Sequence, residues 1–301
     1  MPETDQNKPR WSAELALLVV CLIWGCNFAV MKSVFDELHP FAFNAVRLTL
    51  STVVLGIWHH VKQKRLPPLP PGTWWKILGL SLIGYFAYQV VFLLGLKRTP
   101  SGNSALIISS APIFTAMLGL FLGERLRRGA WIGLLIAFGG AIVIALQKGV
   151  ELESGLLVGN LLSLAAAATW GSFTALNRGV AQLIPGASLA YYTTLITLPL
   201  HWLIALPHLD PFIELTVTSD AWLAIAFSGL FGTGLAYAFW NLGIERMGAS
   251  HTAGFVNIVP VIALFVGWAG LGEPVSWIQI GGGLFVLGGV WVMRMARGER
   301  R

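Results

Sequence analysis

The stretch AELALLVVCLIWGCNFAVMK, residues 13–32, decides the fold of this chain. It places 20 residues in a row with charges only near its two ends, at Glu14 and Lys32. A helix of that length is about 30 Å long, which is the thickness of the hydrocarbon core of a bilayer. No small-residue cleavage site follows the apolar run, as it would in a secretory signal. We therefore expect this segment to be retained as a first membrane-spanning helix.

The same kind of segment recurs along the whole chain. The candidate spans cover residues 13–32, 39–59, 73–96, 101–122, 129–146, 154–177, 187–206, 220–243, 249–271 and 275–295. Short joints that contain Gly and Pro separate them, and none of these joints is long enough to form a soluble domain. The sequence therefore predicts an all-α membrane protein of ten transmembrane helices, a multi-pass protein of the cell (inner) membrane.

The composition also points to a bilayer environment. Hydrophobic residues make up 55% of the 301 residues, charged residues make up 11%, and the mean hydropathy is +0.71. One soluble core of this length could not hide so much apolar surface, so we expect lipid to cover it. The 20 Lys and Arg residues are spread between the apolar runs rather than gathered in one patch, which argues against nucleic acid as a partner.

The positions of the positive charges predict the orientation. If the N-terminus is cytoplasmic, most Lys and Arg residues fall on that side. The opposite side receives only Lys32, Lys97, Arg98 and Lys148. Cytoplasmic loops are enriched in Lys and Arg, so both termini are expected to be cytoplasmic. Residues 1–12 would then form an N-terminal tail and residues 296–301 a basic C-terminal tail.

An internal repeat divides the chain into two halves. The repeated positions include Trp24-Gly25 with Trp170-Gly171, Pro112 with Pro260, and Gly123-Glu124 with Gly272-Glu273. Their offset stays between about 146 and 149 residues. The halves, residues 13–146 and 154–295, hold five candidate spans each. Because five is an odd number, the second half must enter the membrane upside down relative to the first.

These repeated residues also carry a family resemblance. The chain resembles the drug/metabolite transporter superfamily, in particular its ten-helix EamA-type members. The resemblance lies in the early Trp-Gly of each half, Arg47 in the second helix, the mid-helix prolines and the Gly-Glu that ends the fourth and ninth helices. It implies two repeats around a central cavity, alternating access, and export or uptake of small metabolites such as amino acids. We accordingly expect a secondary transporter, an exporter of a small-molecule substrate, that uses no cofactor.

Arg47 is the most unusual residue of the predicted spans. It lies seven residues past Pro40 and therefore roughly 10 Å into the second helix. A guanidinium at that depth is costly unless it is paired or hydrated. It either faces the cavity and holds a substrate carboxylate or phosphate through two hydrogen bonds, or it clamps backbone carbonyls or extends toward the interface.

The acidic residues show the opposite distribution. They lie in tails, loops and helix ends, and none occupies the midplane of a predicted span. A deep carboxylate that could carry a proton is therefore missing, although Glu14 near the cytoplasmic end of the first helix is a candidate for testing. Facilitated diffusion or exchange fits this distribution better than proton coupling.

Aromatic and amide residues recur where a cavity is expected. The trio that begins at Tyr85 and the trio that begins at Tyr237 both have the spacing i, i+3, i+4, which puts each trio on one helix face. The expected substrate-binding residues are Trp24, Asn27, Arg47, Tyr85, Tyr88, Gln89, Trp170, Tyr191, Tyr237, Trp240, Asn241 and Asn257. The alternative is that Trp and Tyr form interfacial belts and that the amides hold helices together.

Two prolines and two acids mark the fourth and ninth spans. Pro112 and Pro260 lie near mid-helix, where each removes a backbone donor and serves either as a hinge or as a static kink. Ser109 and Ser110 could satisfy the carbonyls freed there. Glu124 and Glu273 end these helices. We expect each to accept from the start of the next helix or to pair with a base such as Arg127, and both are candidate gates.

Small residues predict close helix contacts. They are Gly129, Gly133, Ala137 and Ala141 in the fifth span and Gly281 with Gly288 in the tenth. Such residues let two helix backbones approach. The contact lies either inside the molecule or on a homodimer surface, so both a monomer and a homodimer remain open.

Two other functions share some of these features. A flippase of lipid or lipid-linked headgroups would have the same architecture, with access for the headgroup from the side of the bundle. A membrane-embedded enzyme would need a catalytic group at depth, and no HExxH, paired Asp or Ser/His arrangement appears. Cys21 and Cys26 fall inside the first apolar run, and the six histidines show no ligand spacing, so neither a catalytic nor a metal site is expected.

Overall fold

The computed structural model describes residues 10–63, 69, 71–121, 128–146, 155–177, 179–180, 183–247 and 255–298. Within these ranges all regular structure is helical. A helix satisfies its own backbone hydrogen bonds, which is what a chain in hydrocarbon requires. The prediction of an all-α chain is therefore confirmed for the described residues.

The first half contains the helices from α1 to α7. Their bounds are α1 (Arg10–Lys32), α2 (Pro40–Gln63), α3 (Trp74–Leu80), η1 (Ser81–Ala87), α4 (Tyr88–Arg98), α5 (Ser101–Ile108), α6 (Ala111–Phe121) and α7 (Arg128–Ala145). The second half continues with α8 (Leu156–Asn177), α9 (Gly186–Ala205), η3 (Leu206–His208), α10 (Asp210–Ile213), α11 (Ser219–Phe227), η4 (Ser228–Leu235), α12 (Ala236–Met247), η5 (Val256–Ile258), α14 (Val259–Leu271) and α15 (Trp277–Gly298).

Seven helical stretches of the described chain are long and apolar enough to cross a membrane. They cover Ala13–Lys32, Pro40–His59, Trp74–Arg98, Ser101–Phe121, Leu156–Asn177, Gly186–His208 and Ser219–Gly243. Three shorter apolar helices cover Arg128–Ile144, Val256–Leu271 and Trp277–Met293. Every span predicted from the sequence overlaps one of these stretches. The architecture is that of a multi-pass membrane protein.

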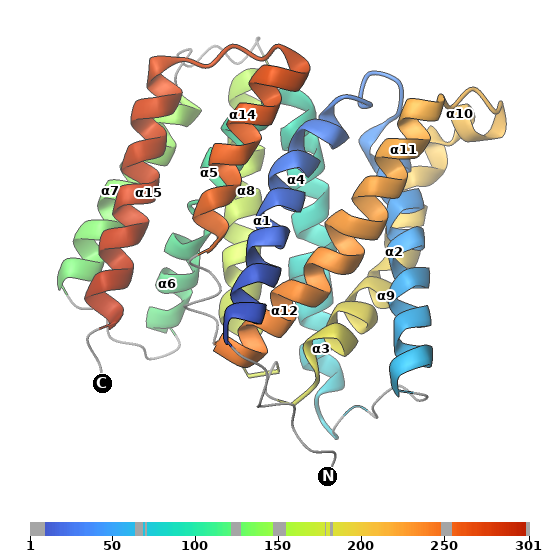
Figure 1. Cartoon of the computed structure of the whole chain (residues 1–301), viewed down its shortest axis with the longest axis horizontal. Coiled ribbons are helices and arrows are strands. Elements are labelled where there is room, and N and C mark those ends of the chain that lie inside the picture. The colour runs from blue at the N-terminus through green and yellow to red at the C-terminus, as the bar shows by residue number, and fades with distance from the viewer. Residues whose placement is uncertain are drawn as a thin grey trace.

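Helices from the two halves interleave in one bundle. The helix α1 lies against α12 and α14, α2 lies against α9, and α8 lies against α4 and α6 (Figure 1). At one end of the bundle α7 and α15 form a pair. The first turn of α1 and the last turn of α15 lie on the same face of the molecule, at the bottom of Figure 1.

The pair of α7 and α15 is held together by small residues. A Cβ on Gly133 would lie 2.5 Å from the carbonyl oxygen of Gly289. A Cβ on Gly289 would in turn collide with the backbone nitrogen of Ala137. Only glycine permits backbones to approach this closely. The close contact predicted for the fifth span is therefore confirmed, and it lies inside the molecule.

The glycines of α15 that make this contact differ from those expected. Gly282 and Gly289 face α7, whereas Gly281 and Gly288 face open space. The expectation for the latter pair was therefore wrong by one position. Both pairs are spaced by one heptad, and the sequence offers no further feature that separates them.

Two spans that the sequence presents as uninterrupted contain a π-helical segment. These segments, η1 and η4, begin 147 residues apart, at Ser81 and Ser228, and so occupy the same place in each half. Side chains from neighbouring helices bond to carbonyls of η4: the Ser51 hydroxyl donates to Gly229 at 2.6 Å, and the Trp24 indole donates to Gly232 at 2.9 Å. Stretches of π-helix are rare and often mark functional sites.

Breaks in the fourth and ninth spans replace the kinks expected at the prolines. The helix α5 ends at Ile108 and α6 begins at Ala111, so Pro112 lies in a first turn rather than at mid-helix. The hydroxyls of Ser109 and Ser110 donate to the carbonyls of Leu106 and Ile107, both at 2.6 Å. Likewise, the short 3₁₀ turn η5 precedes α14, and Pro260 is the second residue of α14. A missing N–H costs nothing in a first turn, so each proline fits a helix start.

Candidate substrate-binding cavity

A cavity lies at the centre of the bundle, between helices of both halves. It is lined by Trp24, Asn27, Phe28, Met31, Arg47, Tyr88, Gln89, Phe92, Ala105, Ile108, Ser109, Trp170, Gly232, Thr233, Tyr237, Val256, Val259 and Pro260. The centres of water-sized spheres can reach about 70 Å³ of it. One water needs about 10–15 Å³ on that measure, so the cavity has room for only a few waters in this conformation. A larger solute requires the walls to move apart.

Arg47 enters the cavity from α2 and is only 2% exposed. Its Nε donates to Asn44 Oδ1 at 2.8 Å, its Nη1 donates to Ser228 Oγ at 2.8 Å, and its Nη2 donates to Gln89 Oε1 at 2.6 Å. These three acceptors are all neutral. A guanidinium has five N–H donors, so two of them are left over. The positive charge is therefore held in place by hydrogen bonds without being neutralised by these partners.

A second layer of hydrogen bonds fixes Asn44. Its Nδ2 lies 3.1 Å from Nδ1 of His201 on α9, while Nε2 of the same ring lies 3.1 Å from the carbonyl oxygen of Tyr85. Because Asn44 Oδ1 already accepts from Arg47, its amide nitrogen must be the donor to Nδ1. The ring proton is then on Nε2, where the carbonyl accepts it. A neutral histidine thus connects Arg47 to the π-helical segment η1.

Gln89 links Arg47 to the second half. Its Oε1 accepts from Arg47, and its Nε2 donates to the Tyr237 hydroxyl at 3.3 Å. Gln89 lies in the first turn of α4, and Tyr237 lies in the first turn of α12. Both positions follow directly after a π-helical segment. The polar end of the cavity is therefore built at corresponding places of the two halves.

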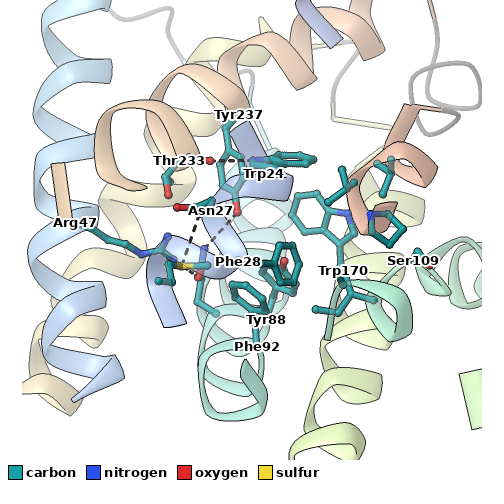
Figure 2. Close-up of a pocket in the computed structure, with 18 residues that line it drawn as sticks. Trp24, Asn27, Phe28, Arg47, Tyr88, Phe92, Ser109, Trp170, Thr233 and Tyr237 are labelled. Carbon is teal, nitrogen blue, oxygen red and sulfur yellow. Dashed lines mark hydrogen bonds between the residues drawn. The ribbon is translucent and has the colours of Figure 1, made fainter. Parts of the chain in front are cut away.

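Aromatic rings form another part of the wall. Trp24 is the centre of this group, with ring centroids 6.2 Å from Trp170, 5.8 Å from Tyr237 and 5.2 Å from Trp240. Tyr88 lies 5.0 Å from Trp170 on the same measure. Figure 2 shows Arg47 at one side of the cavity and Trp170 at the other. The cavity therefore has a charged end and an aromatic end.

Comparison with known proteins identifies the family. A family model described as the EamA-like transporter family matches residues 11–146 and matches again over residues 157–295. The chain belongs to the EamA-like transporter family. Family membership makes it a transporter of a small-molecule substrate and not an enzyme.

Several relatives of this EamA-like transporter match over nearly their whole length. The uncharacterized transporter YyaM of Bacillus subtilis is 30% identical over 92% of this chain and 91% of its own. A probable terminal-alkyne amino-acid exporter of Streptantibioticus cattleyicolor is 28% identical over 95% of both chains. A probable amino-acid metabolite efflux pump of Salmonella typhimurium is 26% identical over 92% of this chain and 93% of its own. A crystal structure with 22% identity shares the fold, with a TM-score of 0.68 over 97% of this chain and 100% of that one.

The structure brings seven of the twelve expected substrate-binding residues of this EamA-like transporter to the cavity. They are Trp24, Asn27, Arg47, Tyr88, Gln89, Trp170 and Tyr237. Two more lie directly behind the wall: Trp240 packs against Trp24, and Tyr85 packs against Tyr237 with ring centroids 5.3 Å apart.

The remaining three expected residues lie outside the cavity lining. Tyr191 is near Gly56 of α2 and has its ring centroid 5.7 Å from that of His59. Asn241 packs against Gly186 at the start of α9. Asn257 is in η5, next to the lining residue Val256.

Of the expected hinges, Pro260 lines the cavity and Pro112 does not. Of the expected gates, Glu124 lies outside the described residues. Glu273 has a defined partner, although not the one expected. Its carboxylate accepts from the backbone nitrogen of Ser101 at 2.9 Å and from the Ser101 hydroxyl at 2.6 Å. Ser101 is the first residue of α5, in the first half, and not part of the next helix α15.

The Gly-Glu pair is shaped by the local geometry of this site. Gly272 ends α14 with φ of 65°, a left-handed conformation that favours glycine. This turn brings the Glu273 carboxylate to the N-terminus of α5. A carboxylate at a helix N-terminus is favourable, because the free backbone N–H groups and the helix dipole both attract it.

Sequence reasoning missed three polar residues around Arg47, namely Asn44, His201 and Ser228. Asn44 carried a usable signal, because it lies three residues before Arg47 and so on the same helix face. His201 and Ser228 come from α9 and η4, and only the tertiary structure brings them to α2.

Proposed function

We propose that this protein is a secondary transporter that exports small metabolites of the amino-acid type across the cell (inner) membrane. The observation that carries the proposal is a buried Arg47 whose three hydrogen-bond acceptors are neutral, in the wall of a central cavity. A charged group in a membrane protein is retained at such cost where it serves a substrate or ion pathway. Relatives named as an amino-acid exporter and an amino-acid metabolite efflux pump support the substrate type.

The proposed topology has ten transmembrane helices in two inverted repeats, with both termini in the cytoplasm. The seven long and three shorter apolar helices supply the spans. The family model matches the chain twice, and the paired π-helical segments repeat at the same offset. The excess of Lys and Arg on the side of the termini supports the orientation.

Alternating access would open the cavity to one side at a time. The break between α5 and α6 and the turn before α14 are the proposed hinges, with Pro112 and Pro260 in the first turn after each. Glu273 is the proposed gate, because its bonds to Ser101 tie the end of α14 to the first half. Glu124, the corresponding residue of the first half, is proposed as the second gate.

Transport in this mechanism needs no carboxylate that carries a proton through the midplane. Arg47 is the proposed fixed charge, and the anionic group of the substrate neutralises it on binding. Since the substrate brings the compensating charge, loading the cavity lowers the cost of the buried cation. Exchange of one substrate for another then becomes easier than return of the empty transporter.

The experiment is uptake and counterflow of labelled amino acids in proteoliposomes, with wild type and Arg47→Gln compared at equal and at opposed pH. Saturable counterflow that is lost in Arg47→Gln and does not respond to a pH difference supports the proposal. Flux that follows the pH difference refutes the uncoupled mechanism. A complete lack of amino-acid flux in the wild type refutes the substrate type.

A flippase function is the second candidate, and one observation favours it. An apolar groove lies between α5, α14 and α15. Its volume is about 360 Å³ on the measure used for the cavity. It is lined by Leu106, Val261, Leu264, Phe265, Trp268, Val275, Gln279, Ile280, Gly283, Leu284 and Leu287. The helices α5 and α14 lie between the groove and the cavity, because Ala105 and Pro260 line the cavity while their neighbours Leu106 and Val261 line the groove. Movement of a fluorescent lipid between leaflets of the same proteoliposomes would support this alternative.

A further inference from the structure

Asn27, which lines the cavity, carries a buried hydrogen-bond acceptor that has no partner in the described part of the chain. The residue is 5% exposed, and its Oδ1 has no hydrogen-bond partner among the described residues. Its Nδ2 faces the sulfur of Met31 at 3.7 Å. Toward an amide, a thioether sulfur can act only as an acceptor. The amide atom of Asn27 that contacts Met31 is therefore the nitrogen. A buried acceptor without a partner destabilises the protein, so such a group in a cavity wall is a candidate to accept a hydrogen bond from a ligand.

The position of Asn27 is rigid. Its amide lies against Gly232, where a Cβ would be 2.8 Å from Nδ2 and 3.2 Å from Oδ1. Gly232 is itself held by the Trp24 indole, which donates to its carbonyl. Since these contacts hold the amide in this place, the unpaired oxygen keeps its position in the cavity wall without help from a ligand.

The cavity therefore offers two complementary groups. Arg47 has two N–H donors beyond those used in its three hydrogen bonds, and these carry positive charge. Asn27 Oδ1 is an acceptor without a full charge. A carboxylate at position 27 would be drawn to Arg47 and would neutralise it, whereas an amide leaves the guanidinium available. The remaining lining is mostly apolar, with Trp170 at the side opposite Arg47 (Figure 2).

We propose that Asn27 is the specificity-determining residue for a protonated amine, and that the cavity recognises zwitterionic amino acids with an apolar or aromatic side chain. The carboxylate of the substrate binds Arg47, its ammonium group donates to Asn27 Oδ1, and its side chain lies toward Trp170 and Tyr88. This inference rests on the proposed transport function and assigns the substrate groups to residues.

The experiment compares three compounds that share one aromatic body. L-Phenylalanine has both charged groups, 3-phenylpropionate has only the carboxylate, and 2-phenylethylamine has only the ammonium group. Each is used to inhibit counterflow of labelled L-phenylalanine in proteoliposomes that contain wild type, Asn27→Ala or the control Asn177→Ala. Asn177 is also a buried asparagine with an unpaired Oδ1 among the described residues, but it lies at the end of α8, outside the cavity lining.

Asn27→Ala should weaken inhibition by L-phenylalanine by about tenfold or more, which is the value of one hydrogen bond to a charged group. Inhibition by 3-phenylpropionate should change by less than about twofold, because that compound has no group for Asn27. Inhibition by 2-phenylethylamine should weaken together with that by L-phenylalanine. Asn177→Ala should leave the ratios of the inhibition constants at their wild-type values.

Two outcomes separate this inference from the proposed function. If Asn27→Ala weakens phenylalanine and phenylpropionate equally, Asn27 has only a structural role, and the inference fails while the transport function stands. If the wild type shows no counterflow of any amino acid, the proposed function fails and the inference with it. An apparent melting temperature of Asn27→Ala within a few degrees of the wild type shows that the comparison is made on folded protein.

Discussion

Arg47 donates to Gln89 at 2.6 Å, and this hydrogen bond joins the buried charge of α2 to the first turn of α4. Gln89 is neutral, so the bond holds the guanidinium without cancelling its charge. The identity of this one side chain decides whether the cavity keeps a free positive charge.

Gln89→Glu should separate the structural role of Arg47 from its role in binding. The new carboxylate would form a buried ion pair with Arg47, so the protein should fold at least as stably as Gln89→Met, which has a similar shape and no acceptor. Counterflow of carboxylate-bearing substrates should nevertheless fall by about tenfold or more, because the site charge is cancelled. Counterflow and apparent melting temperature of both variants are the measurements. Full transport by Gln89→Glu would mean that Arg47 does not hold the substrate anion.

Glu273→Gln should weaken the attachment of α14 to α5. Both carboxylate oxygens face the backbone nitrogen of Ser101, and a neutral amide accepts such bonds less strongly. We expect a loss of about 1 kcal/mol of stability, seen as a lower apparent melting temperature. Glu214→Gln is the control, since Glu214 is exposed near α10. If both variants melt alike, Glu273 contributes nothing as a cap.

Stability should fall in mild acid because of His39. Its ring is stacked on His208 with centroids 3.5 Å apart, and its Nδ1 accepts from the backbone nitrogen of Phe41. Burial, followed by the charges of His208, Lys97 and Arg98, lowers the pKa of His39 from 6.5 to about 4. Between those two values the unfolded chain binds more protons than the folded one, so the free energy of unfolding decreases as the pH falls through this window.

His39→Asn tests this effect. Asparagine keeps an acceptor at the start of α2 but cannot be protonated. The drop in apparent melting temperature between pH 7.5 and pH 5 should therefore be smaller in the variant than in the wild type. Titrating groups that do not contact His39 are common to both proteins and cancel in the difference. An equal drop in both would exclude His39 as a source of the pH dependence.

Gly289→Ala and Gly288→Ala should change the stability of the protein differently, although the two residues are neighbours. A Cβ on Gly289 would collide with the backbone of α7, whereas one on Gly288 meets nothing within 4 Å. The first substitution should cost about 1–3 kcal/mol through forced separation of the helices. The second should be neutral or stabilising by about 0.5–1 kcal/mol, because alanine is the better helix former. Thermal unfolding in detergent gives both values, and equal behaviour would contradict the packing of α7 on α15.

The sequence was sufficient to predict the helical segments and to single out Arg47, which lines the cavity. Apolar runs of about 20 residues match the thickness of a bilayer and seldom occur outside membrane-spanning helices. A guanidinium such as Arg47 inside one of these runs needs a specific environment. A close helix contact of α7 was also predictable from its small residues, although the partner helix was not.

Finer features could not be predicted because the signals are ambiguous in a membrane. Lipid and protein interior are both apolar, so periodicity does not tell which face of a helix is buried. Trp170 and Tyr191 therefore looked alike, although only Trp170 reaches the cavity. Ser228, one of the neutral partners of Arg47, lies 181 residues away in sequence, and nothing in its local sequence marks it.

The paired π-helical segments have a consequence for changes in chain length. A π-helical ring closes over one residue more than an α-helical ring, so η1 and η4 each contain a surplus residue that an ordinary span would lack. Leu82 and Phe231 are large exposed side chains within these segments. Removing one of them would let the segment close into an ordinary helix, whereas a deletion inside α8 would turn every following side chain to another face. Single-residue deletions in this fold should therefore survive selection at these two places more often than elsewhere in the spans.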